Sequence, residues 1–217
     1  INTTVNPVNV TYVYTLTAGG CPNPVAYNVV VTVNPTPLLT SSLTPPAICS
    51  GSVFNYAPGS ATAGTTFAWS RAAVAGIAEP ASSGTDNPAE ILTNTTLVTI
   101  NVTYVYTLTA NGCSHNQNVV VAVHPRPTVV VSGSTTICFT PSLGGPPPIP
   151  GEHGAGGDSG FPGLIFTFTG TPPWTLTYTD GTTPVTVTGI TSNPFIVSVN
   201  PAVTTTYTAT ALSDALC

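Results

Sequence analysis

One ten-residue segment, NVTYVYTLTA, occurs twice in this chain of 217 residues, at positions 9–18 and again at positions 101–110. A cysteine follows shortly after each copy, Cys21 after the first and Cys113 after the second. Valine, threonine and tyrosine alternate in the segment with a period of two, which is the pattern of a β-strand with two different faces. The identical repeat predicts that two parts of the chain fold in the same way.

The sequence after each copy also matches, with AYNVVVTVNPTP after the first and NQNVVVAVHPRP after the second. The intervening AGG and ANG turns accept positive φ without strain, so each copy predicts an antiparallel hairpin. A degenerate third copy of the strand occupies residues 203–217, and PPAICSGS recurs as STTICFTP. A period of about 90 residues, filled with short alternating strands, is typical of β-sandwich domains.

Proline-rich exits, NPTP and HPRP, indicate the domain boundaries, because proline removes ladder donors and stiffens a joint. Residues 1–36 are then the last strands of a partial domain, and residues 37–126 are a complete domain. Residues 127–217 form a third domain without its final strand, and it carries a Gly/Pro-rich insertion at 141–163. The surplus strands at one end and the missing strand at the other suggest head-to-tail self-assembly, since exposed strand edges recruit strands.

Charge is scarce, because only 4% of the residues are charged against about 25% in ordinary soluble domains. The two basic residues, Arg71 and Arg126, are too few to neutralise a phosphate backbone, so we expect no nucleic-acid partner. No apolar run reaches about 18 residues, and we expect no membrane span. A chain without Met or a signal peptide is expected to be a mature product or a piece of something larger, and its lysine-free, threonine-rich β pattern suits an extracellular setting.

The segments CSGSVFNY, AGTTFAWSRAAVAGI, NVTYVYTLTANGC and NVVVAVHPRP resemble the PKD-like and Ig-like tandem repeats of very large secreted and cell-surface proteins of Bacteroidota. FTGTPPWTLTYTDG, TPVTVTGI and TTTYTATALSD look like a sister type of repeat from the same proteins. The resemblance covers essentially the whole chain and is closest in the middle domain. It implies an all-β chain of tandem Ig-like/PKD-like β-sandwich domains.

The resemblance also implies a function. Such repeats are structural segments of extracellular filaments, stalks, adhesins or gliding-type surface proteins, and they have no catalytic residues to carry over. The chain is therefore not expected to be an enzyme, and no cofactor is expected. The expected partners are neighbouring repeats of the same protein, further copies of the chain, and surface glycans.

Five cysteines in an oxidising compartment indicate disulfides. We expect Cys49 to pair with Cys113 and Cys138 with Cys217, because each pair joins the early segment of a domain to the end of its penultimate strand. In the chain-entropy model each bridge contributes about 4 kcal/mol. Cys21 is left over and is expected to be unpaired or paired outside the segment, an intermolecular bond being the alternative.

The aromatic residues of the central strands are expected in the hydrophobic core: Trp69, Trp174, Tyr104 and Tyr106. Tyr12 and Tyr14, their counterparts in the first copy, share one face of a strand and are expected to point into a core as well. The alternative is that exposed aromatic residues stack on sugars, which would make the chain a carbohydrate-binding module.

The acidic residues show no spacing typical of a catalytic or EF-hand site. Glu79, Asp86 and Glu90 fall in one loop region, where solvated polar residues are the first interpretation and calcium binding is the alternative. Glu152, His153 and Asp158 in the insertion leave the same two interpretations open. The tetrapeptide GDSG resembles a serine-protease loop but has no supporting His/Asp pattern. We therefore expect no metal site and no catalytic site.

Overall fold

Both copies of the repeated segment form long strands, Val8–Ala18 (β1) and Ile100–Ala110 (β8), and each begins an antiparallel hairpin. Their partners are Cys21–Val33 (β2) and Cys113–His124 (β9). Both two-residue turns have positive φ at both positions, 57° and 80° in the first and 50° and 76° in the second. These signs are those of a type I′ turn, whose twist matches that of the strands. The two predicted hairpins are therefore confirmed.

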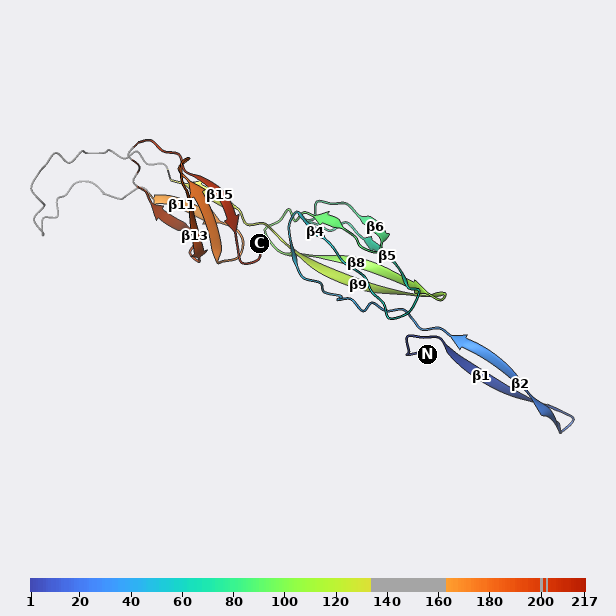
Figure 1. Cartoon of the computed structure of the whole chain (residues 1–217). Helices are drawn as coiled ribbons and strands as arrows, with labels where there is room; N and C mark the ends of the chain where they lie inside the picture. Colours follow the sequence, from blue (N-terminus) through green and yellow to red (C-terminus); the bar gives the residue numbers. More distant parts are fainter. Residues whose placement is uncertain (134–162, 200, 202) are drawn as a thin grey trace, which may run out of the picture. The chain divides into compact units, whose positions relative to one another are not determined.

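The computed structural model describes residues 1–133, 163–199, 201 and 203–217. All regular elements in these ranges are β-strands, and the expectation of an all-β chain is confirmed. The chain divides into two units, Ile1–Pro125 and Arg126–Cys217 (Figure 1). Nearly all of the predicted insertion at 141–163 lies outside the described residues, since only Gly163 is included.

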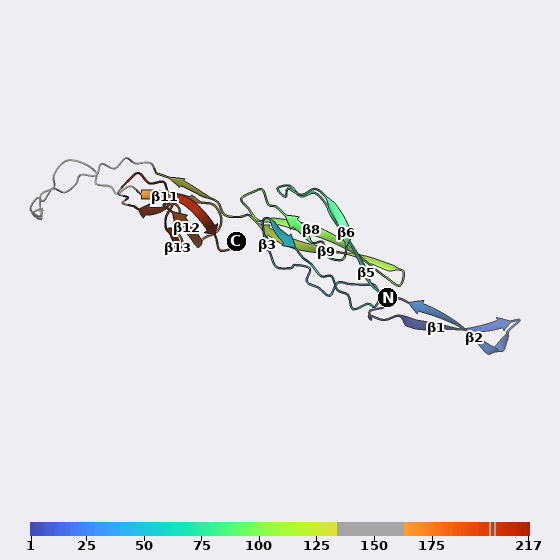
Figure 2. The ribbon, with the colours of Figure 1, turned by 45° about the horizontal axis from the view of Figure 1, so that its top comes forward.

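The larger sheet of the first unit has five strands in the order β3-β9-β8-β5-β6. Its additional strands are Ile48–Cys49 (β3), Thr66–Arg71 (β5) and Ser82–Thr85 (β6). Figure 2 shows β3 beside β9, where the two strands run parallel, whereas the other pairs are antiparallel. The two longest strands therefore lie at the centre of the sheet, bonded on both edges.

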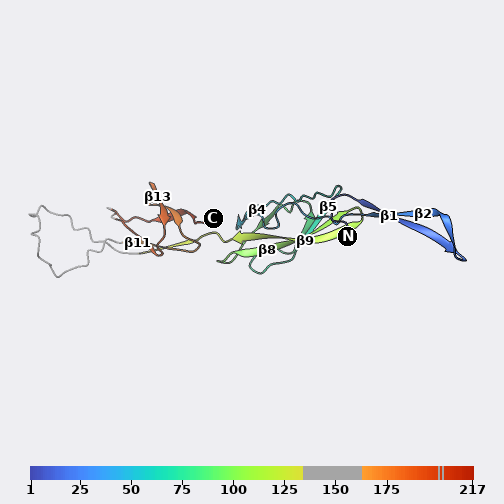
Figure 3. The same ribbon diagram turned by 90° about the horizontal axis from the view of Figure 1, so that it is seen from below.

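A small second sheet, Ser52–Phe54 (β4) with Glu90–Leu92 (β7), shares one hydrophobic core with the five-stranded sheet. The ribbon in Figure 3 labels β4 of the small sheet together with β5, β8 and β9 of the larger one. Alternate residues of β8 and β9 point into this core and are fully buried, as period-two patterning requires. Those residues are Val102, Tyr104, Tyr106, Leu108, Val119, Val121 and Val123. Two sheets around one core are consistent with a β-sandwich.

The second unit contains two three-stranded sheets, with orders β10-β11-β14 and β13-β12-β15. Their strands are Val129–Ser132 (β10), Gly163–Phe168 (β11), Trp174–Thr179 (β12), Pro184–Ile190 (β13), Phe195–Ser198 (β14) and Thr208–Ser213 (β15). Both sheets contribute to one core, which includes Phe166 of β11 and Trp174 of β12. No helix in the described part of the chain has the length and apolar character needed to cross a membrane.

Gly84 of β6 lies against the indole of the buried Trp69. A Cβ at position 84 would come within 2.8 Å of Cζ2 of that ring, which has little room to move in a close-packed core. We expect Gly84→Ala to lower the free energy of unfolding by about 1–3 kcal/mol, as measured by urea denaturation. Ser83→Ala at the exposed neighbouring position is the control, with an expected change within about 0.5 kcal/mol.

Candidate functional site

The β1–β2 hairpin presents an uncovered apolar face, which we call the ribbon face. Its members are Val10, Tyr12, Tyr14, Leu16, Val29 and Val31, each between 39% and 53% exposed. Tyr12 and Tyr14 are 51% and 53% exposed, whereas their counterparts Tyr104 and Tyr106 are 0% exposed. The expectation that Tyr12 and Tyr14 lie in a core is therefore wrong for this structure, because β1 and β2 form a two-stranded sheet of their own.

An asparagine fixes the chain just before β8. The Asn94 side-chain amide donates to the carbonyl of Val98 at 2.7 Å and to the carbonyl of Val123 at 2.9 Å. Its Oδ1 accepts from the backbone N–H of Thr96 at 2.9 Å. We call this arrangement the asparagine clip, since one side chain ties the approach to β8 onto the end of β9.

The same clip precedes β1. The Asn2 amide donates to the carbonyls of Asn6 and Val33, both at 2.8 Å. Its Oδ1 accepts from the backbone N–H of Thr4 at 2.9 Å. The structural repeat therefore includes the asparagine clip as well as the strands and the turn. Sequence reasoning missed this feature, although NTT recurs at 2–4 and 94–96 and was the signal available.

A buried ion pair joins β5, β7 and β8 in the first unit. Arg71 is 2% exposed, and its Nε lies 2.9 Å from Oε2 of Glu90. The same carboxylate oxygen accepts from the hydroxyl of Tyr104 at 2.7 Å. Arg71 also donates to the carbonyl of Pro80 at 2.7 Å. The guanidinium and the carboxylate are thus both supplied with partners, as buried charges require.

The pKa values of this cluster follow from its contacts. The hydrogen bond to Glu90 raises the pKa of Arg71 above its usual value, against the opposing effect of burial. Burial alone would raise the pKa of Glu90, but the hydrogen bonds from Arg71 and Tyr104 outweigh it, so the pKa is lowered. Burial, followed by the adjacent Glu90 carboxylate, raises the pKa of Tyr104. The cluster therefore holds its charges in fixed states at neutral pH.

Two of the three acidic residues considered for calcium in this region, Glu79 and Glu90, have other partners. The Glu90 carboxylate is bound to Arg71, and Glu79 Oε2 accepts from the backbone N–H of Thr93 at 2.8 Å. Among the described residues no group of three or more His, Cys, Asp or Glu side chains is placed to hold a metal ion.

The sequence signal for the ion pair of Arg71 and Glu90 was the alternation of the strands, since Arg71 follows Trp69 by two residues and Glu90 precedes Leu92 by two. Both charged residues therefore share a face with a core residue.

The aromatic residues expected in the core are buried. Trp69 is 6% exposed and Trp174 is 4% exposed. Trp174 Nε1 donates to the carbonyl of Thr169 at 3.0 Å, while the ring of Trp69 packs edge-on against Tyr104. Neither indole presents a face on which a sugar could stack.

The cysteines differ from the expected pairing. Cys49 takes part in a disulfide and so does Cys217, whereas Cys21 and Cys113 are free thiols. The expected bridge between Cys49 and Cys113 is therefore wrong for this structure, and Cys138 lies outside the described residues. Cys21 is unpaired, which is one of the two states expected for it.

The parallel pairing of β3 with β9 explains the difference. Cys49 lies opposite His124, at the last residue of β9, whereas Cys113 is the first residue of that strand. A strand of this length separates its ends by roughly 36 Å at about 3.3 Å per residue. Disulfides need Cα atoms within about 7 Å. The sequence did not reveal which end of β9 the short strand β3 would join.

Thiol labelling tests this assignment. We expect iodoacetamide to modify Cys21 and Cys113 in the unreduced protein, and Cys49 and Cys217 only after reduction. Labelling in urea without reductant controls for the partial burial of Cys113, and peptide masses identify the modified sites. If Cys113 in urea is labelled only after reduction, it forms a disulfide, and the assignment of a free thiol at Cys113 is contradicted.

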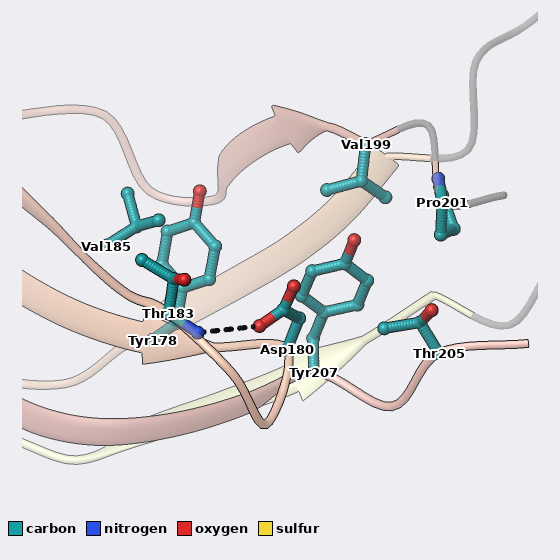
Figure 4. Close-up of a pocket in the computed structure, with 8 residues that line it drawn as sticks. All are labelled: Tyr178, Asp180, Thr183, Val185, Val199, Pro201, Thr205 and Tyr207. Carbon is teal, nitrogen blue, oxygen red and sulfur yellow. Dashed lines mark hydrogen bonds between the residues drawn. The ribbon is translucent and has the colours of Figure 1, made fainter. Parts of the chain in front are cut away.

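The second unit has a pocket of about 440 Å³. Its lining residues are Tyr178, Asp180, Thr183, Val185, Val199, Pro201, Thr205 and Tyr207. Figure 4 shows the Asp180 carboxylate between the two tyrosine rings. Hydrogen bonds from Thr182 and from the backbone of Thr183 lower the pKa of Asp180 to about 2, so the pocket contains a carboxylate at neutral pH. A charged acceptor beside aromatic rings and hydroxyls suits a polyhydroxylated ligand.

The sequence matches no family model and no curated protein.

Proposed function

We propose that this chain is a structural, non-catalytic segment of an extracellular surface filament, stalk or adhesin. It would be built from tandem Ig-like/PKD-like β-sandwich domains of the type found in secreted proteins of Bacteroidota. The observation that carries the proposal is the recurrence of one structural unit, which consists of the asparagine clip, the long strand, the I′ turn and the return strand. Stacked copies of one module are the usual basis of elongated proteins.

The path of the chain through the first unit supports a role as a spacer. Asn34, just after β2, donates to the carbonyl of Asn111 in the β8–β9 turn at 2.7 Å. The chain therefore enters the five-stranded module near that turn, and β9 ends at His124, at the opposite end of the same hairpin. A module entered at one end and left at the other adds its full strand length to a stalk.

The disulfide-bonded cysteines and the scarcity of charge support an extracellular setting. Disulfides persist in oxidising compartments and are rare in the cytosol, and two cysteines of this chain are disulfide-bonded. The polar residues of the chain are mainly threonine, serine and asparagine, and only 4% of all residues are charged. Neighbouring repeats of the same protein are the partners in this proposal.

Immunogold labelling of intact cells tests the proposed function. Antibodies raised against residues 37–126 are expected to decorate rods or fibres on unpermeabilised cells. Gold confined to permeabilised cells would contradict it. An intracellular marker protein, labelled in parallel, controls for cell integrity.

The pocket favours a second candidate function, binding of a surface glycan. The half-buried Tyr207 offers part of its ring, and Asp180 with Thr205 offers groups that bind hydroxyls. A glycan array is expected to show binding that Asp180→Ala abolishes and Asp214→Ala, outside the pocket, retains. Absence of binding by the unmodified chain at millimolar glycan would contradict this candidate and leave the structural role intact.

A further inference from the structure

The ribbon face is an apolar surface without charge. Residues 1–36 contain no Asp, Glu, Lys, Arg or His. The exposed side chains of this face form a contiguous row on one side of a two-stranded ribbon. In typical monomers the largest apolar patch measures about 300–600 Å² and is often functional. A partner for this face must therefore be apolar, and it must also supply backbone groups to the free edges of β1 and β2.

The first unit itself shows what covers such a face. Over the equivalent hairpin β8–β9 lie Phe54 of β4, Trp69 of β5 and Leu92 of β7, all part of one core. The rings of Phe54 and Trp69 lie 5.0 Å and 5.5 Å from the ring of Tyr104. The counterparts of all six members of the ribbon face are thereby fully buried in the middle module: Val102, Tyr104, Tyr106, Leu108, Val119 and Val121.

The edge of β8 is also occupied. β5 pairs antiparallel with it, with Ser70 opposite Val105 and Thr66 opposite Thr109. Because β1 and β8 have the same sequence in this region, the equivalent edge of β1 is residues 13–17. Among the strands of the described residues, none pairs with that edge.

The tyrosine hydroxyls specify the partner further. Tyr104 donates to the Glu90 carboxylate at 2.7 Å, and Tyr106 donates to the carbonyl of Asp86 at 2.9 Å. The hydroxyls of Tyr12 and Tyr14 would need the same two acceptors once buried, since a buried donor without an acceptor costs about 1–3 kcal/mol. A partner with an inward carboxylate and a turn carbonyl at this spacing would satisfy both.

We propose that the ribbon face binds the front half of a module of the same type as residues 37–93, in the register that β4, β5 and β7 adopt on β8–β9. A β5-like strand pairs antiparallel with residues 13–17, its tryptophan lies against Tyr12, and a glutamate held by an arginine accepts the Tyr12 hydroxyl. This inference rests on the proposed function as a modular protein, and it adds the partner that the ribbon face binds.

The partner is a front half without a back half of its own. In a second folded copy of this chain, the front half is already paired with β8, whose sequence is identical to β1 over ten residues. The intramolecular partner has the advantage of effective concentration, which reaches millimolar values for short linkers. A complete second copy is therefore outcompeted by its own hairpin.

An in-register fusion tests the proposal. Residues 37–93 are joined directly to Asn2 of the chain, because Asn2 and Asn94 occupy the same position in the asparagine clip. Backbone hydrogen exchange is then measured at residues 13–17 in the fusion and in the unfused chain. We expect the exchange to slow by at least about 100-fold in the fusion, as for core strands protected by cooperative unfolding. Residues 105–109 of the middle module serve as the internal reference.

Matched variants on one strand identify the face that is used. Tyr14→Ser in the fusion is expected to remove most of the protection at residues 13–17, whereas Val13→Ser on the opposite face is expected to retain it. Unchanged exchange at residues 13–17 with an intact reference strand overturns the proposal. Concentration-dependent protection in the unfused chain would instead identify a second copy as the occupant and overturn it equally. None of these results depends on cellular location, so they are separate from the labelling test of the proposed function.

Discussion

Tyr106→Ala is expected to lower the free energy of unfolding of the middle module by about 3–5 kcal/mol, the usual cost of truncating a large core aromatic side chain. Tyr106 is fully buried, its ring lies 5.3 Å from that of Tyr56, and its hydroxyl donates to the carbonyl of Asp86. Urea denaturation followed by the fluorescence of Trp69 and Trp174 measures the change.

The chain supplies its own control for this substitution. Tyr14→Ala removes the same side chain from the same decapeptide, but Tyr14 is 53% exposed. The expected change in the free energy of unfolding is within about 0.5 kcal/mol. Equal losses at the two positions would show that the β1–β2 hairpin is already covered in solution, which contradicts the structure described here.

Glu90→Ala is expected to lower the free energy of unfolding by about 3–5 kcal/mol, because it leaves the buried guanidinium of Arg71 without its counter-charge. Arg71 is enclosed by backbone carbonyls and core residues, and its side chain is 0% exposed. Replacing both members, as in Arg71→Met with Glu90→Leu, is expected to recover part of the loss, since an apolar pair of similar volume is often neutral or stabilising. The remainder is the cost of the buried Tyr104 hydroxyl, which loses its acceptor in the double variant. A double variant as unstable as Glu90→Ala would contradict the assignment of the loss to an unpaired charge.

The same residue gives the module a defined response to acid. The folded pKa of Glu90 is below its ordinary value, which is about 4.3 in model peptides. Its contribution to stability is therefore fully present above that pH and is lost as the pH falls through the depressed folded pKa. Urea midpoints recorded between about pH 2 and 6 should show a smaller slope for Glu90→Gln than for the unmodified chain.

Local patterns predicted the parts of the fold that depend on neighbours in sequence. The period-two alternation of the repeated segment specified strands with two faces, and the AGG and ANG turns specified where those strands reverse. Trp69 and Tyr104 could be placed in the core because they share faces with valine and leucine. The burial of Arg71 follows from the same alternation, because Arg71 lies two residues after Trp69 on the same strand.

Features that depend on long-range pairing were not predictable in the same way. The two-residue strand β3 carries too little pattern to reveal that it runs parallel to the end of β9, and this placement keeps Cys49 away from Cys113. The environment of Tyr12 and Tyr14 depends on whether other strands cover them, and their sequence is identical in both cases. The lining of the pocket comes from residues 178–207, whose approach depends on the packing of the second unit.

The two identical decapeptides also affect the order in which the chain can fold during synthesis. Strand β5 emerges after β1 but before β8, so its first available partner has the same sequence as its final one. A transient exchange of one hairpin for the other is a characteristic hazard of repeat proteins. Correct assembly then requires β8 to displace β1, and slower synthesis through residues 72–110 would prolong the competing state.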